Sequence, residues 1–252
     1  GQCYSNLNYL CKNIGNRITG SAEAEMAIYW GERVLKSYGF DKVYLQKITV
    51  PHWERGTTES AWILNEKGDF LKVNVLALGG SVGTNGLLEK EVLVVANIEA
   101  LKKLKKSAVE GKIVYLGQAF DAKNIRTFTS YGQCGIQRWS GASEAAKLGA
   151  VGLVIRSLGS EIDDYPHTGT LGYEDGVAKI PAAAISTQDC NTLEEWAKMG
   201  KIKVRMEMDC RWYENTTSYN VVGEMTGTKS DKIITWGGHL DSWDVGEGAH
   251  DD

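Results

Sequence analysis

A largely apolar run, Lys232 to Trp236, leads directly into the sequence Gly237-Gly238-His239-Leu240-Asp241. The run has the length and composition of a buried strand, and ligands in open α/β sheets gather beyond the carboxyl ends of such strands. The glycine pair lets the backbone turn tightly at that end, so that the residues after it can project into a crevice. The sequence therefore predicts an α/β fold with a site directly after this strand.

The residues after the glycine pair have the chemistry of a metal site. Residues two apart in an extended chain point to the same side, so His239 and Asp241 are expected to lie together. One imidazole nitrogen of His239 can then bind zinc while Asp241 hydrogen-bonds the other and fixes the tautomer. Asp251 adds a carboxylate whose two oxygens can bridge two metal ions ~3.5–4 Å apart. Taken alone, a His-x-Asp pattern more often marks a structural histidine beside a turn than a metal ligand.

The pattern along the chain divides it into an outer part and an insert. An amphipathic helix is expected from the N-cap Ser21 to Gly39, and strands are expected at Asp41–Val50 and Tyr219–Met225. Between them, short β-rich runs broken by glycine alternate with helical segments, which is typical of a separate mixed α and β unit. We therefore expect residues 1–78 and 211–252 to belong together and residues 79–210 to form the insert.

Composition excludes two classes of partner. The formal net charge of -4 and the pI near 5.7 provide no basic field for a phosphate backbone, so no nucleic-acid partner is expected. No apolar stretch approaches the ~18 residues that span a bilayer, so no membrane span is expected. The five cysteines lack C-x-x-C spacing, which argues against a cysteine zinc site and leaves their pairing open.

Several motifs resemble one family of peptidases. The stretch from Gly237 to Asp252 resembles the signature of the di-zinc aminopeptidase superfamily and, within it, of the carboxypeptidase Q family. Further stretches resemble the same family in the same order: Pro51-His52-Trp53-Glu54-Arg55-Gly56, Pro166-His167-Thr168-Gly169 and Ile180-Pro181-Ala182. The resemblance covers nearly the whole chain. It implies part of a zinc-peptidase α/β/α sandwich that is interrupted by a protease-associated (PA) domain, in agreement with the insert expected at 79–210.

The resemblance also implies an activity. Members of the family are metal-dependent exopeptidases that hydrolyse dipeptides or short peptides with a free N-terminus, using a water activated by two zinc ions. By motif position, His239 is implied as a ligand of one zinc ion, Asp251 as the bridging ligand, and Asp241 as the catalytic carboxylate that orients His239. A secreted or exported location (extracellular, periplasmic or lysosomal) is implied as well, and a homodimer is left open.

The family pattern continues beyond Asp251 with a Glu-Glu pair, a further acidic ligand and a final histidine, which the 252 residues do not reach. We therefore expect the chain to be the front part of a longer enzyme and to be inactive by itself, because it lacks the general base. The alternative function is a non-catalytic PA-domain binding protein. His52 and His167 are expected to make structural hydrogen bonds, with a place in the substrate cleft as the alternative for His167.

Overall fold

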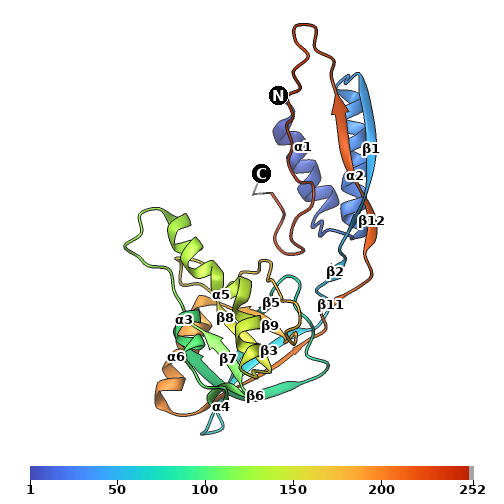
Figure 1. The fold of residues 1–252 in the computed structure, drawn as a ribbon. Helices are drawn as coiled ribbons and strands as arrows, with labels where there is room; N and C mark the ends of the chain where they lie inside the picture. The colour runs from blue at the N-terminus through green and yellow to red at the C-terminus, as the bar shows by residue number, and fades with distance from the viewer. Residues whose placement is uncertain (250–252) are drawn as a thin grey trace. The chain divides into compact units, whose positions relative to one another are not determined.

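The computed structural model describes residues 1–249, so Asp251 lies outside the described part of the chain. The chain divides into two compact units, which we call unit 1 (Gly1–Trp53 with Tyr213–Asp252) and unit 2 (Glu54–Trp212) (Figure 1). The connections run through two short strands that pair with each other, β2 (Trp53–Glu54) and β11 (Arg211–Trp212). Unit 2 is therefore one uninterrupted stretch that is inserted into unit 1.

Unit 1 is built on a two-stranded antiparallel sheet. Strands β1 (Lys42–Val50) and β12 (Thr216–Glu224) pair along their whole length, from Lys42 opposite Glu224 to Val50 opposite Thr216. Helix α2 (Ala22–Ser37) packs against them; it begins where the hydroxyl of Ser21 accepts a hydrogen bond of 3.1 Å from the Ala24 amide. The expected helix and both expected strands are confirmed here. Helix α1 (Cys3–Tyr9) and a π-helical turn (Leu10–Ile14) precede α2.

The prediction of a strand at Lys232–Trp236 is wrong. The chain from 225 to 249 contains neither helix nor strand, and Ile233, Ile234 and Trp236 are 90%, 81% and 91% exposed. A strand is stabilised by hydrogen bonds to a neighbouring strand, and no strand in residues 1–249 pairs with this run. Apolar composition alone therefore does not produce the element.

Unit 2 contains an eight-stranded mixed sheet with the order β4-β3-β10-β6-β7-β8-β9-β5. Its four strands β6 to β9 are parallel to one another, and the remaining neighbours are antiparallel. The bounds in sheet order are Phe70–Val73, Glu59–Asn65, Ile202–Met208, Leu88–Val95, Ile113–Leu116, Gly152–Arg156, Ala182–Ile185 and Val75–Ala77. A hairpin at Asn65–Gly68 joins β3 to β4, with the Asn65 side chain accepting hydrogen bonds from the Lys67 and Asp69 amides.

The sheet explains where unit 2 begins. Strand β3 pairs with β10 over seven residues, from Glu59 opposite Met208 to Asn65 opposite Ile202. This pairing ties residues that the sequence pattern grouped with the outer part to the end of the insert. The compact unit consequently starts at Glu54, whereas the sequence prediction put the insert at 79–210.

Helices cover both faces of the parallel strands. On one face, helices α3 (Ile98–Lys102) and α5 (Thr127–Lys147) share an apolar core with alternate residues of β7 and β8. The short helix α4 (Lys106–Val109) contributes Val109 to the same core. At Gly141 the helix comes so close to the sheet that an added Cβ would lie 3.0 Å from methyl groups of Leu116 and Leu153. Because strand residues alternate, Tyr115 points to the other face, where α6 (Thr187–Met199) lies. The α/β fold class is therefore confirmed.

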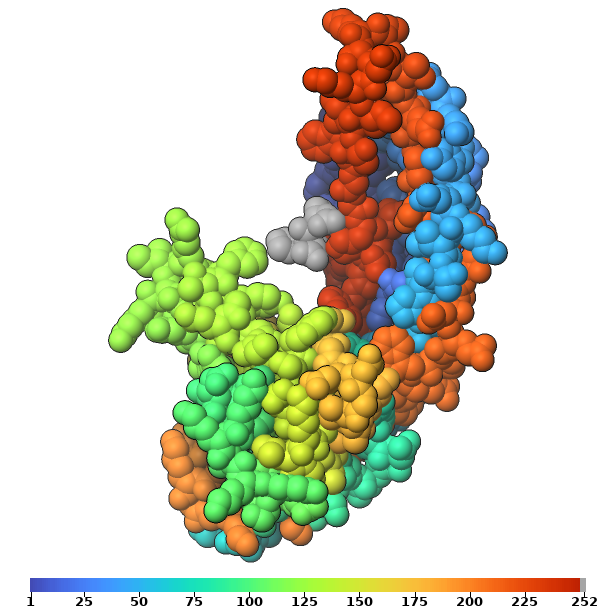
Figure 2. Space-filling model, viewed as in Figure 1, coloured from blue at the N-terminus to red at the C-terminus, as the bar shows by residue number. Residues whose placement is uncertain are grey.

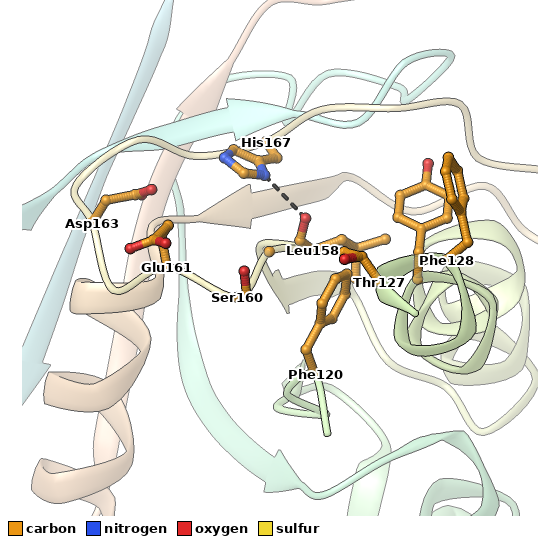
Figure 3. A pocket seen from close by; sticks show the side chains of 10 residues that line it. Phe120, Thr127, Phe128, Leu158, Ser160, Glu161, Asp163 and His167 are labelled. Atoms are coloured by element: carbon orange, nitrogen blue, oxygen red, sulfur yellow. Dashed lines mark hydrogen bonds between the residues drawn. The ribbon is translucent and has the colours of Figure 1, made fainter. Parts of the chain in front are cut away.

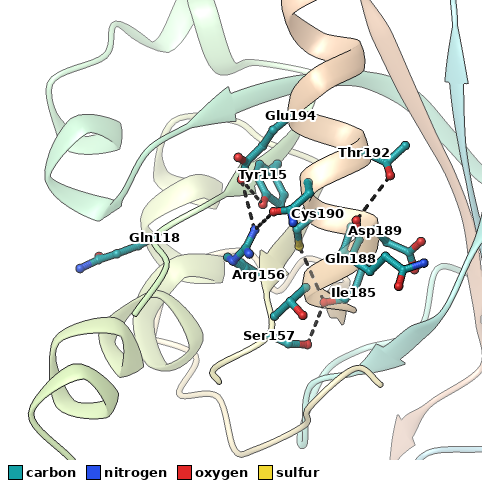
Figure 4. A network of polar contacts seen from close by, with 12 residues as sticks. Tyr115, Gln118, Arg156, Ser157, Ile185, Gln188, Asp189, Cys190, Thr192 and Glu194 are labelled. Atoms are coloured by element: carbon teal, nitrogen blue, oxygen red, sulfur yellow. Dashed lines mark hydrogen bonds and ion pairs between the residues drawn. The ribbon is translucent and has the colours of Figure 1, made fainter. Parts of the chain in front are cut away.

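A polar network lies between β7, β8 and α6 (Figure 4). The Tyr115 hydroxyl donates to Glu194 at 2.7 Å, and Arg156 donates to the Asn191 side chain at 2.9 Å and lies 3.7 Å from Glu194. Cys190 is fully buried beside this network, and burial raises the pKa of its thiol to about 12. Glu194 therefore balances the charge of the buried Arg156, and burial keeps Cys190 protonated at physiological pH.

All five cysteines are free thiols, and only Cys3 is exposed.

Among the described residues, no helix combines the length and the apolar composition that crossing a membrane requires.

These thiols are expected to react in two classes with a chromogenic disulfide at pH 8. Cys3 should react within seconds to minutes, whereas Cys190, with a thiolate fraction of about one in ten thousand, should react only after unfolding. Cys3→Ser should remove the fast phase, and denaturant should expose every remaining thiol. A second thiol that reacts as fast as Cys3 in the native protein would contradict the buried positions.

Candidate metal centre

The segment that carries the predicted ligands folds back onto the start of the chain. After β12, the chain returns to residues 11–19, and both segments belong to unit 1 (Figure 1). The Asn16 side chain donates to the Asp244 carbonyl at 2.8 Å, and Lys12 forms an ion pair with Glu247. The site is therefore assembled from residues more than 220 positions apart in sequence.

Arg17 holds this segment from the inside. Its side chain is 2% exposed, and its Nε donates to the Leu240 carbonyl at 2.8 Å. One terminal nitrogen donates to the Gly248 carbonyl at 2.9 Å and the other to Gly15 at 2.5 Å. The Arg17 backbone adds two hydrogen bonds with Ser242, of 3.0 and 3.1 Å. One residue therefore fixes both ends of the loop from Leu240 to Gly248.

Gly248 is required where this loop closes. Its φ is +57°, and an added Cβ would lie 2.5 Å from the Ser242 hydroxyl and 3.0 Å from the Arg17 guanidinium. A larger residue would therefore force the loop away from Arg17.

His239 and Asp241 lie together in this loop. The Nδ1 atom of His239 is 3.1 Å from Oδ1 of Asp241 and 2.8 Å from the Asp241 carbonyl oxygen. Thr19 donates a hydrogen bond to the other carboxylate oxygen of Asp241. The His239 and Asp241 side chains are 45% and 42% exposed, so both can be reached from solvent. The structure thus brings together the two residues that the motif predicted to pair.

The contacts of His239 suit the role of a metal ligand. A carboxylate and a carbonyl can only accept, so Nδ1 of His239 carries the proton and Nε2 is the nitrogen that a zinc ion would take. Among residues 1–249, no group of three or more His, Cys, Asp or Glu side chains is arranged around one point. The predicted bridging ligand, Asp251, lies outside the described residues, so its role stays a prediction.

Sequence reasoning missed the residues that support the pair. Arg17 and Thr19 lie in Gly15-Asn16-Arg17-Ile18-Thr19-Gly20, which precedes the first long helix and carries no metal-ligand spacing. The available signal was an arginine and polar residues enclosed by two glycines with φ of +85° and +92°. Such a segment is ordered and turns sharply, but its partner cannot be read from local sequence.

Comparison with known proteins bears on this site. No family model matches the chain. Carboxypeptidase Q from Mus musculus and that from Homo sapiens are each 40% identical to it, over 99% of this chain and 51% of their own length. This chain is a homologue of carboxypeptidase Q. It spans about half the length of these curated relatives. Leucine aminopeptidase 2 of Trichophyton equinum is a more distant relative, 28% identical over 94% of this chain.

Solved structures agree with the likeness to carboxypeptidase Q. A peptidase M28 precursor from Shewanella amazonensis has a TM-score of 0.90 and 37% identity, covering 98% of this chain and 55% of that one. An aminopeptidase from Aneurinibacillus has a TM-score of 0.63 at 21% identity, covering 98% of this chain and 53% of that one, which supports the fold alone. The α/β fold is therefore shared with metallopeptidases.

Replacing Arg17 is expected to loosen the loop. In Arg17→Lys, one ammonium cannot reach three diverging carbonyls, so the loss should be about 2–3 kcal/mol in unfolding free energy. Arg33→Lys, an exchange at an exposed site on α2, should cost less than about 0.5 kcal/mol. Hydrogen exchange read by mass spectrometry should accelerate in residues 239–249 and stay unchanged in unit 2. Equal protection of that loop in Arg17→Lys and wild type would refute its role.

Proposed function

We propose that the whole protein is a secreted or exported, two-zinc exopeptidase that hydrolyses dipeptides or short peptides with a free N-terminus. The observation that carries the proposal is the contact of His239 Nδ1 with Asp241, at the motif position of a chain homologous to carboxypeptidase Q. Imidazole is a usual zinc ligand, a carboxylate commonly holds its second nitrogen, and Arg17 hydrogen-bonds to the loop that carries the pair.

Each residue has a defined part in this proposal. Asp241 accepts the Nδ1 proton of His239, which fixes the ring orientation and makes Nε2 the more basic donor. Thr19 restrains the same carboxylate through its second oxygen. A bound zinc pair would supply Lewis acidity and a water that ionises near neutral pH. The remaining ligands and the general base are proposed to lie outside the described residues.

Asp241→Asn is expected to weaken zinc binding by roughly 10- to 100-fold, because an amide is a poorer acceptor for the Nδ1 proton. Competition with a chromophoric chelator on the full-length protein measures the affinity directly. Asp231→Asn, at an exposed site in the same segment, is the matched control and should leave it unchanged. Unchanged zinc affinity in Asp241→Asn would remove Asp241 from the site.

Residues 1–252 expressed alone are expected to hydrolyse no dipeptide, even with added zinc. Within residues 1–252 the proposal assigns two zinc ligands, His239 and Asp251, whereas a catalytic zinc takes about three protein ligands and a second ion needs more. Amine release from several dipeptides, with and without chelator, measures this. Chelator-sensitive turnover by these residues would show that they already contain a complete site.

A further inference from the structure

A second site lies in unit 2, at the end of the sheet where open α/β folds place their ligands. A pocket of about 340 Å³ is enclosed by the chain after β7 and by the chain after β8 (Figure 3). These two strands are parallel neighbours, so their carboxyl ends meet at the same edge of the sheet. Ligands in open parallel sheets bind in the crevice outside these carboxyl ends. The pocket therefore has the position of a binding site and contains no residue of the candidate metal centre.

One side of the pocket is aromatic. Phe120, Phe128 and Tyr131 line it together with Leu158, and the rings of Phe128 and Tyr131 lie edge to face with centroids 6.4 Å apart. Phe128 is 86% exposed although it belongs to the first turn of α5. This end of α5 and the loop before it project from the body of unit 2 (Figure 2). Exposed aromatic side chains grouped around a pocket mark a surface that binds an apolar group.

The other side of the pocket is acidic. Glu161 and Asp163 come from the loop after β8, and the described lining includes no lysine or arginine. Asp163 is held in place, since one carboxylate oxygen accepts from the Tyr165 amide at 3.0 Å. His167 directs Nδ1 at the Leu158 carbonyl, 3.1 Å away, so that its Nε2 is an acceptor in the neutral ring. The polar groups of this wall therefore suit a ligand that donates hydrogen bonds and is positively charged.

A cationic side chain contacts the aromatic wall. Arg138 lies over the Tyr131 ring at 5.3 Å and donates to the Tyr131 hydroxyl at 2.7 Å. It thereby supports the aromatic wall from behind and is absent from the lining.

We propose that this pocket binds the N-terminal end of a peptide whose first side chain is large and apolar. The side chain packs against Phe128 and Tyr131, and the α-ammonium group faces Glu161 and Asp163. The same chemistry occurs in free aromatic amines, so the test separates peptides from amines. The site goes beyond the proposed peptidase activity, because binding here needs no metal.

Calorimetric titration of the intact protein in excess chelator tests the proposal, with the dipeptide Phe-Gly, its N-acetyl derivative and phenethylamine as probes. Phe-Gly is expected to bind with saturation, and acetylation should weaken binding about fivefold or more by removing the charge. Phenethylamine lacks the peptide group and should bind more weakly than Phe-Gly. Equal affinity of the two would identify a site for amines and would overturn the assignment to peptides.

Two exposed residues provide the variants. Glu161→Gln should weaken Phe-Gly binding about three- to fivefold, and Phe128→Ala about tenfold, whereas Glu195→Gln on α6 should have no effect. Unchanged circular dichroism and melting temperature would verify folding in each. The proposal is overturned if Phe-Gly fails to bind at millimolar concentration, if its acetylated form binds equally well, or if neither pocket variant differs from Glu195→Gln. A failure of zinc-dependent hydrolysis would leave each of these results unaffected.

Discussion

Unit 1 depends on a buried cation that is surrounded by backbone carbonyls. The guanidinium of Arg17 meets carbonyls of Gly15, Leu240 and Gly248, which belong to the two ends of the chain. A buried charge is costly unless it is hydrogen-bonded, and Arg can satisfy several acceptors because its donors are fixed in a plane. The same contacts satisfy carbonyls in a loop that has no strand neighbour of its own. Order at His239 and Asp241 is thus maintained by hydrogen bonds from Arg17 to the backbone of their loop, at Leu240 and Gly248.

Local patterns predicted the elements whose stability is itself local. The Ser21 cap and the hydrophobic period of α2 depend on residues close in sequence, so their signals are complete within a short window. The proximity of His239 and Asp241 was predictable for the same reason, because the two residues are neighbours in one turn. Their bracing by Arg17 and Thr19 was not predictable, since it joins segments more than 220 residues apart.

Two discrepancies have a common cause in strand pairing. Lys232–Trp236 has the composition of a strand but has no paired neighbour among residues 1–249. Strand β3 was grouped with the outer part by its position, whereas pairing with β10 makes it part of unit 2. Composition can indicate that a segment suits a sheet, but the choice of sheet depends on which distant strand offers its edge.

The pairing of β2 with β11 brings the beginning and the end of unit 2 together. Because the stretch between them has its own sheet and its own apolar core, it can be gained or lost as a module without breaking a strand of unit 1. Substitutions inside that module can alter its pocket while the loop around His239 keeps its bracing, since Arg17 hydrogen-bonds to Gly15, Leu240 and Gly248, which all belong to unit 1. Recognition and chemistry could therefore diverge at separate rates during the evolution of this fold.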